Sequence, residues 1–376
     1  MIIAIPKEVI PGENRVSIVP DMASKLAKKG FEIHVEKGAG FKAGFTDAQY
    51  EAAGAKMYEN VEELYNSVEI VLKVQRPVEK EVDLFKEGQL LITFMYSLHY
   101  PEVAQKCAEK KINVISMDAI PRTTLAQKMD ALSSQANIAG YKSVIMAANQ
   151  LRKIFPLMMT AAGTIQPARV VIMGAGVAGL QALGTARRLG AIVEVSDIRP
   201  AVKEEVQSLG GRFIEVESDE DMQDEGGYAK EASEEFLKKQ KELIFKHITE
   251  ADIVITTALV PGKKAPILVT EEMVKKMRPG SVVLDMATEF GGNCEISEFG
   301  ETVVKHDVTI IGESNIPSLV ATNSSEVYSK NLQALLEHIS SEGKVELNLE
   351  DEIVAGSLIT HNGEVVHERT KEALQK

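Results

Sequence analysis

The chain has 376 residues, of which 44% are hydrophobic and 26% charged, and its formal net charge is −13. This length exceeds that of one ordinary domain, so we expect a globular protein with two large domains. The acidic balance argues against a nucleic acid or an anionic membrane surface as a direct partner.

The sequence shows no targeting segment and no metal or disulfide framework. Every apolar run is shorter than the ~20 residues that a membrane helix needs, and the N-terminal sequence MIIAIPKEV lacks the basic region of a signal peptide. Cys107 and Cys294 lie outside any C-x-x-C or Cys/His cluster, and the seven histidines are scattered. We therefore expect a cytoplasmic protein without a metal site.

Residues 1 to 118 alternate short strand patterns with helical segments. This alternation predicts an α/β domain with a parallel sheet. Helices are expected at residues 21–29, 46–53 and 101–109, the second capped by Thr46. The expected strands are Ile2 to Ile5, Phe31 to Val35, Val68 to Val74, Leu90 to Phe94 and Ile112 to Met117.

The next segment, IPRTTLAQKMDALSSQANIAGY (residues 120–141), is polar and unperiodic until about Ser133. A helix is expected from there to about Arg152, followed by a loop over Met158 to Gly163. Spacing predicts that the buried face of this helix carries Ile138, Tyr141, Ile145 and Ala148.

A glycine fingerprint follows a continuous apolar run over Val170 to Met173, which is typical of a buried parallel strand. Gly174, Gly176 and Gly179 form G-x-G-x-x-G between this strand and a helix. The first glycine allows a tight turn, the second lets a pyrophosphate approach the backbone, and the third lets the helix pack on the strand. The motif in this context predicts dinucleotide binding.

Asp197 ends the next expected strand, Ile192 to Val195, where a carboxylate can accept both hydroxyls of an adenosine ribose. This carboxylate favours NAD(H), because a 2′-phosphate beside it would meet a like charge. Arg199 is the residue that would weaken this preference. The expected cofactor contacts in this stretch are Gly174, Ala175, Gly176, Val177, Gly179, Asp197, Ile198 and Arg199.

The α/β pattern continues after an acidic insertion at residues 217–235, which contains Gly227 and Tyr228. The insertion is typical of an exposed loop with a tethered aromatic, and a solvated charge run is the alternative. Ligands bind at the carboxyl ends of strands in such sheets. That rule places Thr257, Ala258, Leu259, Pro261, Asp285 and residues 289–293 around the nicotinamide half of the cofactor.

The last part of the chain predicts one long helix from near residue 320, with Tyr328, Leu332, Leu335 and Ile339 on one face. A hairpin of two strands, at residues 353–359 and 364–367, follows with Asn362-Gly363 as its turn. We expect two Rossmann-like α/β domains with mostly parallel sheets, joined by two long helices. The first comprises residues 1–136 and 320–376, and the NAD(H)-binding domain comprises residues 137–319.

The sequence lacks G-x-S-x-G, H-E-x-x-H and P-loop motifs, so any chemistry should belong to the nicotinamide. The chain resembles the NAD(H)-binding component of proton-translocating NAD(P) transhydrogenase, a family related to alanine dehydrogenase. The resemblance runs over nearly the whole chain. It is densest in PRTTLAQKMDALSSQANIAGY, FPLMMTAAGTIQPARVVIMGAGVAGLQALGTARRLGA, GGYAKE, ITTALVPGKKAPILVTEEMV and GGNC.

The resemblance implies direct, Re/Si-specific hydride transfer between NAD(H) on this chain and NADP(H) on a partner subunit. Arg122, Asp130 and Ser133 would hold the nicotinamide, and Gln127 would reach the second nucleotide. The loop with Gly227 and Tyr228 would close over the bound cofactor. The family also implies a homodimer that joins membrane-spanning subunits. These would pump protons and hold the chain at the inner face of the cell membrane.

Alanine dehydrogenase is the main alternative, because it shares the architecture and catalyses another reaction. In that relative a lysine and a histidine polarise the substrate, whereas this chain has Gln75 at the lysine position and Tyr96 or Ser97 near the histidine position. Arg15 matches the relative's substrate-carboxylate arginine, and His99 lies close in sequence. Transfer between two nicotinamides needs no general acid or base, so the missing lysine favours transhydrogenation. A non-catalytic NAD(H)-binding protein is disfavoured by the full polar set at residues 122–133.

Overall fold

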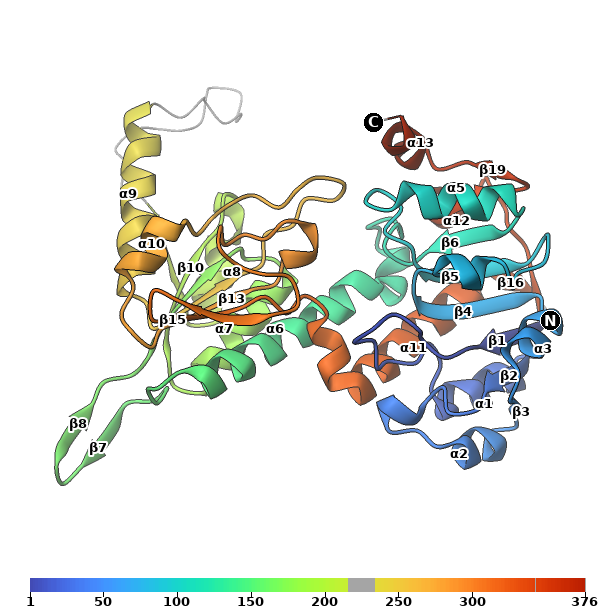
Figure 1. Ribbon diagram of the computed structural model, residues 1–376, viewed down its shortest axis with the longest axis horizontal. Helices are drawn as coiled ribbons and strands as arrows, with labels where there is room; N and C mark the ends of the chain where they lie inside the picture. The colour runs from blue at the N-terminus through green and yellow to red at the C-terminus, as the bar shows by residue number, and fades with distance from the viewer. Residues whose placement is uncertain (216–233, 342, 376) are drawn as a thin grey trace. The chain divides into compact units, whose positions relative to one another are not determined.

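The computed structural model describes residues 1–215, 234–341 and 343–375, and the chain divides into two compact units (Figure 1). Unit 1 comprises Met1–Ala136 and Pro317–Lys376, and unit 2 comprises Asn137–Ile316. Among the described residues, no helix is both long and apolar enough to span a membrane.

Unit 1 is built on a sheet whose described strands run in the order β19-β18-β6-β5-β4-β1-β2-β3. Strands β6 to β3 in this order are parallel, whereas β18 pairs antiparallel with β6 and with β19. The strands are β1 (Ile2–Ile5), β2 (Glu32–Glu36), β3 (Lys56–Tyr58), β4 (Ile70–Gln75), β5 (Leu90–Phe94), β6 (Asn113–Ser116), β18 (Leu358–His361) and β19 (Glu364–Val365).

Helices cover both faces of this sheet and bury two apolar clusters against it. The predicted face of the last long helix is confirmed, since Tyr328, Leu332 and Leu335 are fully buried. The elements are α1 (Pro20–Lys28), η1 (Phe41–Ala43), α2 (Asp47–Ala52), α3 (Val61–Asn66), α4 (Glu79–Val82), α5 (Pro101–Glu109), η2 (Leu125–Met129), η5 (Ile316–Val320), α11 (Ala321–Ile339), α12 (Glu352–Ser357) and α13 (Glu368–Leu374), with a short strand pair β16 (Ser340–Ser341) and β17 (Lys344–Val345).

Unit 2 has a second sheet, in the order β11-β10-β9-β12-β13-β15-β14, parallel except for its edge strand β14. The order reverses between β9 and β12, which is the point where doubly wound sheets bind ligands. The strands are β9 (Arg169–Met173), β10 (Ile192–Ser196), β11 (Arg212–Phe213), β12 (Ile253–Thr256), β13 (Val282–Asp285), β14 (Thr302–Lys305) and β15 (Val308–Ile311). The helices are α7 (Val177–Arg188), η3 (Pro200–Val202), α8 (Lys203–Ser208), α9 (Glu234–Glu250), α10 (Glu271–Lys276) and η4 (Thr288–Phe290). The predicted α/β class with two mostly parallel sheets is thus confirmed.

Helix α6 (Ala131–Gln150) begins in unit 1 and ends in unit 2. The spacing found its buried face only in part: Ala148 packs on the core of unit 2 and Tyr141 is 46% exposed, whereas the buried side carries Gln135, Ala139, Ser143 and Ala147. Small residues bring this side close to α7, since a Cβ on Gly140 would lie 2.2 Å from the carbonyl oxygen of Ala178. Apolar periodicity misses such a face because small side chains make the close packing.

Two further expectations about local structure were wrong. The segment expected as a loop forms an antiparallel hairpin of β7 (Met158–Thr160) and β8 (Gly163–Ile165), which stands clear of the sheet of unit 2 (Figure 1). The strand expected from residue 353 is helix α12, because Asp351 caps its first backbone N–H groups. The Asn362-Gly363 turn is confirmed, with φ of +49° and +90° at its two residues.

Candidate functional site

The fingerprint turn in unit 2 has the geometry that each glycine position requires. Gly174 leaves β9 with φ of +112°, and a Cβ there would lie 2.4 Å from Oγ1 of Thr257. A Cβ on Gly179 would lie 1.9 Å from the carbonyl oxygen of Gly174. The turn and the packing of α7 on β9 therefore both depend on glycine.

Gly176 differs from its two neighbours in the motif, because no atom lies within 4 Å of the place where its Cβ would be. It occupies the N-cap position of α7, and no side chain caps the first backbone N–H groups of this helix. The N-terminus of a helix attracts anions, and open space beside it lets a phosphate come close to the backbone. This turn therefore fits a pyrophosphate.

Asp197 follows β10, and its carboxylate lies beside the fingerprint turn. The amide N–H of Ala175 donates to Oδ2 (2.7 Å), and Arg199 donates to both carboxylate oxygens through its side chain (2.9 Å each) and to Oδ1 through its amide (2.9 Å). Burial alone would raise the pKa of Asp197, but these donors lower it to about 2. The carboxylate is therefore ionised, and its four lone-pair positions are already filled.

The loop after β12 contains Thr257, Ala258 and Leu259. Thr257 donates to the carbonyl oxygens of Met173 and Gly174 (3.3 Å each), which joins this loop to the fingerprint turn. Leu259 is 49% exposed, so its side chain is free to contact a ligand. These three residues lie on the same edge of the sheet as Gly174, as the rule for strand ends predicts.

Asn293, in the connection that follows β13, holds this loop in place. The sequence analysis named it only as part of the range 289–293. Its Oδ1 accepts from the amide of Ala258 (3.0 Å), and its Nδ2 donates to the carbonyl oxygens of Ala258 (2.9 Å) and Pro266 (2.8 Å). Asn293 is fully buried. It holds the backbone of the loop as a neighbouring strand would.

Asp285, which the rule for strand ends placed near the nicotinamide, is bonded to groups of the protein itself. Its side chain is fully buried and accepts hydrogen bonds from the amides of Ala287, Asn293 and Cys294 and from the hydroxyls of Thr256 and Ser297. A carboxylate with this many donors organises the turn around it. Gly227 and Tyr228 lie outside the described residues.

The polar segment of unit 1 contains the residues expected at the nicotinamide. Arg122 and Gln127 are exposed, and Asp130 and Ser133 are half-buried. Asp130 accepts from the amide (2.8 Å) and the hydroxyl (2.6 Å) of Ser133 at the start of α6. These hydrogen bonds cap the helix. The stability of the helix therefore explains the arrangement of this pair, in addition to any role in binding a ligand.

Asn331, on α11, was missed by the sequence analysis. Its Nδ2 donates to the carbonyl oxygen of Lys128 (2.9 Å), and its Oδ1 accepts from the hydroxyl of Ser134 (2.7 Å). Both contacts hold the segment that carries Gln127 and Asp130. Asn331 is a polar residue on the buried side of α11, next to Leu332 in the sequence. A polar residue at such a position was the signal that could have revealed its role.

Arg15 lies in a buried polar network of unit 1. It donates to both carboxylate oxygens of Glu13 (2.8 and 2.7 Å) and to Oε1 of Gln135 (2.8 Å). The Nε2 of Gln75 donates to Oε2 of Glu13 (3.0 Å). Burial would raise the pKa of Glu13, but Arg15 lowers it to about 2. The ammonium group of the nearby Lys73 also has partners within the protein. It is fully buried and forms ion pairs with Glu81 (2.6 Å) and Glu8 (3.4 Å).

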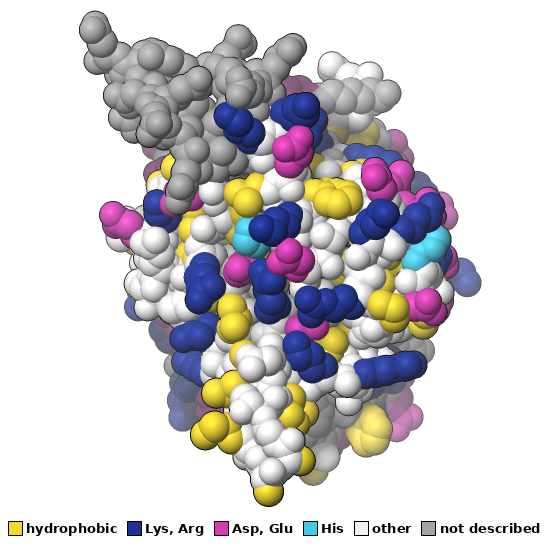
Figure 2. Space-filling model, turned by 90° about the vertical axis from the view of Figure 1, so that its left-hand side faces the viewer, with side chains coloured by type: hydrophobic (Ala, Val, Ile, Leu, Met, Phe, Trp, Pro, Cys, Tyr) yellow, Lys and Arg dark blue, Asp and Glu magenta, His cyan; other side chains and the backbone are white. Residues whose placement is uncertain are grey.

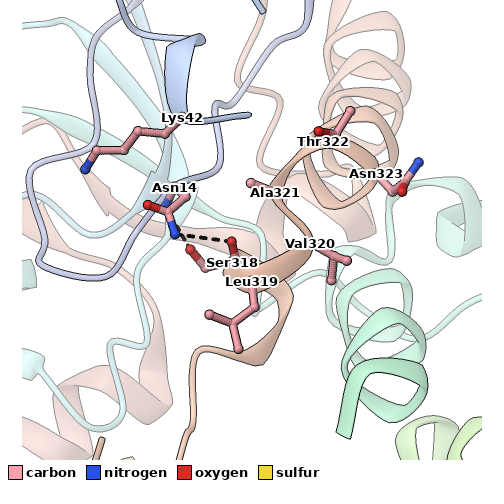
Figure 3. A pocket seen from close by; sticks show the side chains of 8 residues that line it. All are labelled: Asn14, Lys42, Ser318, Leu319, Val320, Ala321, Thr322 and Asn323. Atoms are coloured by element: carbon pink, nitrogen blue, oxygen red, sulfur yellow. Dashed lines mark hydrogen bonds between the residues drawn. The ribbon is translucent and has the colours of Figure 1, made fainter. Parts of the chain in front are cut away.

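A pocket of about 450 Å³ lies elsewhere in unit 1, at the N-terminus of α11 (Figure 3). Nδ2 of Asn14 donates to the carbonyl oxygen of Ser318 (3.3 Å) in η5, just before this helix, whereas the side chain of Lys42 extends away from the labelled residues of α11 (Figure 3). Its lining includes none of the residues expected to bind the cofactor. Among the described residues, no group of three or more His, Cys, Asp or Glu side chains is placed to hold a metal ion.

Comparison with known proteins identifies two family domains in this chain. Residues 4–139 match the N-terminal domain of alanine dehydrogenase/PNT, and residues 143–368 match its C-terminal domain. An NAD(P) transhydrogenase alpha subunit of Rhodospirillum rubrum, the first of the pieces into which that subunit is divided, is 50% identical over 377 residues, which cover 98% of each chain.

Solved structures give the same result at the level of the fold. A crystal structure of transhydrogenase from Sinorhizobium meliloti is 43% identical, has a TM-score of 0.89 and covers 97% of this chain and 100% of its own. An L-alanine dehydrogenase structure is 26% identical, with a TM-score of 0.82, and covers 100% of this chain and 99% of its own. The chain therefore belongs to the alanine dehydrogenase/PNT family, and its similarity to NAD(P) transhydrogenase alpha subunits supports an oxidoreductase that binds NAD(H).

Proposed function

We propose that this chain is the NAD(H)-binding subunit of a proton-translocating, Re/Si-specific transhydrogenase. It transfers hydride directly between its own NAD(H) and NADP(H) held by a partner subunit. The observation that carries this proposal is the amide of Gln75, bonded to Glu13 where the alanine dehydrogenases have a substrate-polarising lysine. The 50% identity to an alpha subunit of NAD(P) transhydrogenase points the same way.

In this proposal, unit 2 binds the adenine half and the pyrophosphate of NADH. The backbone N–H groups at the start of α7 hold the pyrophosphate beside Gly176, where space is open. Asp197, which its lowered pKa keeps ionised, accepts the hydroxyls of the adenosine ribose in place of the two hydrogen bonds from the side chain of Arg199. Val177 and Ile198 are exposed beside these groups, and Thr257, Ala258 and Leu259 contact the nicotinamide half.

The polar segment of unit 1 carries the other residues with a proposed role toward the cofactor. Arg122, Asp130 and Ser133 orient the carboxamide and ring of the nicotinamide, and Gln127 contacts the nucleotide of the partner subunit. Bound NADH supplies the hydride. These side chains contribute proximity and orientation, which can lower the barrier of such a transfer substantially without a general acid or base.

Alanine dehydrogenase activity remains the competing function, because Arg15 is retained. A small oxo acid would need the guanidinium of Arg15 for its carboxylate and a cation or acid for its carbonyl. In this chain Glu13 already pairs with Arg15 through two hydrogen bonds, and Gln75 is neutral. A substrate carboxylate would have to displace Glu13 from a buried ion pair, which is costly.

The proposed assembly follows from the same relatives, whose names describe them as alpha subunits. Two copies of this chain form a homodimer, which binds an NADP(H)-binding subunit and membrane-spanning subunits. Proton translocation belongs to the membrane-spanning subunits. The chain itself is cytoplasmic and peripheral, held at the inner face of the cell membrane by these partners.

The test is an assay of both reactions with the same preparation. The purified chain is mixed with the NADP(H)-binding domain of a transhydrogenase, and reduction of an NADP⁺ analogue by NADH is followed. Alanine with NAD⁺ is assayed in parallel. We expect transfer to the analogue and no NADH formed from alanine. NADH formation from alanine, without transfer to the partner, would overturn the proposal.

A further inference from the structure

In the proposed function, the first turn of α7 binds the pyrophosphate of NADH with backbone groups alone. Residues 174–180 read GAGVAGL and contain no charged or hydroxyl side chain. The phosphate groups are therefore held by the free N–H groups of the helix N-terminus, whose attraction for anions falls off within one turn. The position of this turn consequently sets the affinity for the phosphate groups.

Two close glycine contacts hold this turn, and only one of them belongs to the fingerprint. A Cβ on Gly179 would lie 1.9 Å from the carbonyl oxygen of Gly174. The second contact comes from Gly140 of α6, in the part of this helix that belongs to unit 2. A Cβ on Gly140 would lie 2.2 Å from the carbonyl oxygen of Ala178 and 3.0 Å from its Cα. Both contacts therefore act on the same turn of α7.

The contact at Gly140 has no side chain that could rotate to make room. All the atoms nearest to its added Cβ belong to the backbone of Ala178, and α6 runs beside α7 in unit 2 (Figure 1). On the other helix, Ala139, Ser143 and Ala147 are buried, and close-packed interiors absorb little displacement. An added methyl group would therefore move the two helices apart at the first turn of α7.

Glycine is an unfavourable residue at this place in α6. Gly140 lies near the middle of a 20-residue helix, where glycine loses more conformational freedom on folding than alanine does. About one turn before it, Nδ2 of Asn137 donates to Oε1 of Gln181 in α7 (3.3 Å). The close approach of α6 to α7 supplies the reason for a glycine that helix propensity disfavours.

Surface charge is a separate source of phosphate binding in unit 2. Figure 2 shows Lys and Arg side chains spread over one face of this unit. Exposed cations attract phosphate groups without a fixed geometry, and salt screens this attraction. Binding at a helix N-terminus depends instead on where the N–H groups point. Phosphate affinity that changes with the position of α7, at constant ionic strength, therefore belongs to the turn.

We propose that Gly140 is a positioning residue of the cofactor site. It sets the place of the first turn of α7, through the backbone of Ala178, and thereby the affinity for the phosphate groups of NAD(H). The inference rests on the NAD(H) site of the proposed function. It adds to the three fingerprint glycines a fourth, which lies outside the motif and on another helix.

The experiment compares three ligands of the full chain, namely NADH, ADP and adenosine. ADP carries two linked phosphates like those that NADH places at the turn, whereas adenosine carries none. NADH binding is followed by fluorescence, and the other two ligands by displacement of NADH, all at constant ionic strength. The test variant is Gly140→Ala. The matched control is Gly184→Ala in α7, where no atom lies within 4 Å of the added Cβ.

For Gly140→Ala we expect the dissociation constants of NADH and ADP to rise together by roughly 10-fold, which corresponds to the loss of about one hydrogen bond. The dissociation constant of adenosine should stay within ~2-fold, because adenosine makes no contact through phosphate. Gly184→Ala should bind all three ligands as the wild type does.

A lower folded fraction of Gly140→Ala does not obscure this result. In a calorimetric titration with ADP, the number of sites reports the folded fraction and the dissociation constant reports the site. If this variant does not fold, Asn137→Ala tests the same pair of helices without a clash, because it only removes the hydrogen bond to Gln181. We expect it to weaken NADH and ADP binding by ~2- to 3-fold and to leave adenosine binding unchanged.

Two results would overturn the inference. Unchanged NADH and ADP affinity in folded Gly140→Ala, or in Asn137→Ala where it replaces that variant, would show that Gly140 only packs the helices. An equal loss of adenosine affinity would place the fault in unit 2 as a whole. Both results would leave the proposed hydride transfer intact, whereas a wild type that does not bind NADH would remove the cofactor site itself.

Discussion

The fingerprint turn of unit 2 and the polar segment of unit 1 differ in how far contacts within the protein explain their structure. At the turn, Gly176 stands beside open space at an uncapped helix N-terminus, which the packing of the protein itself does not explain. In the polar segment, Asp130 and Ser133 bond to each other and cap α6. The turn therefore indicates a ligand by its shape, whereas the polar segment is arranged by its own hydrogen bonds.

The largest effect is expected from Gly179→Ala, because the new Cβ would lie 1.9 Å from the carbonyl oxygen of Gly174. Either α7 moves or the turn opens, and both disturb the phosphate site. The free energy of unfolding should fall by ~2–4 kcal/mol, in the range of severe packing faults, and NADH affinity should fall at least ~100-fold with it. Urea unfolding and fluorescence titration with NADH measure the two effects.

Gly184→Ala is the matched control within the same helix. No atom lies within 4 Å of its added Cβ, so the change should raise the stability of α7 by roughly 0.5–1 kcal/mol and leave NADH binding unchanged. If both alanine variants behaved alike, the close contact at Gly179 would not be what shapes the turn.

Gln127→Asn tests the polar segment, and its effect should fall on the reaction instead of on binding. The side chain becomes one methylene shorter and no longer reaches the second nucleotide. Misplacement by about 1 Å can slow a transfer ~100-fold, so we expect single-turnover hydride transfer to fall by about this factor. NADH affinity should stay within ~2-fold, since the adenine half is held elsewhere. A large loss of NADH binding would contradict this role.

Asn331→Ala should have a smaller effect of the same kind. It removes the two hydrogen bonds that hold Lys128 and Ser134, so the segment with Gln127 becomes less ordered. We expect kcat to fall ~10-fold, about the worth of one well-placed hydrogen bond, with little change in NADH affinity. Asn331→Asp, which keeps the acceptor for Ser134, should recover part of the rate. Equal kcat in all three proteins, with lower stability alone, would show that Asn331 is only structural.

The smallest effect is expected at Arg199, and it has the opposite sign. Its guanidinium occupies lone-pair positions on Asp197 that the ribose hydroxyls need. An exposed ion pair is worth about 0.2–1 kcal/mol, so Arg199→Gln should tighten NADH binding by ~1.4- to 5-fold. Weaker NADH binding in titrations of this variant would mean that Arg199 contacts the nucleotide itself.

The sequence predicted the backbone of the nucleotide turn because its requirements are local. The positive φ of Gly174 and the close contact of Gly179 with Gly174 involve only residues of the motif, so the spacing of the glycines was enough to predict the turn. The capping residue Thr46 and the Asn362-Gly363 turn were predicted correctly for the same reason.

Features that depend on distant parts of the chain were not predictable in the same way. Asn331 is linked to Lys128 across the fold, and Asn293 holds a loop 35 residues earlier. The small residues Ala139, Gly140, Ser143 and Ala147 make up much of the buried side of α6, so apolar periodicity found this side only in part. The β7–β8 hairpin was missed because its apolar residues are exposed and its strands pair only with each other among the described strands.

Direct transfer between the two nicotinamides is the central claim, and an isotope tests it most directly. NADH deuterated at the transferred position of C4 is loaded on the chain, mixed with the NADP(H)-binding domain carrying an NADP⁺ analogue, and quenched after one turnover. We predict that the product keeps the full deuterium label, because no step exchanges it with water. Label lost to solvent, or transfer that requires added alanine or pyruvate, would contradict the account.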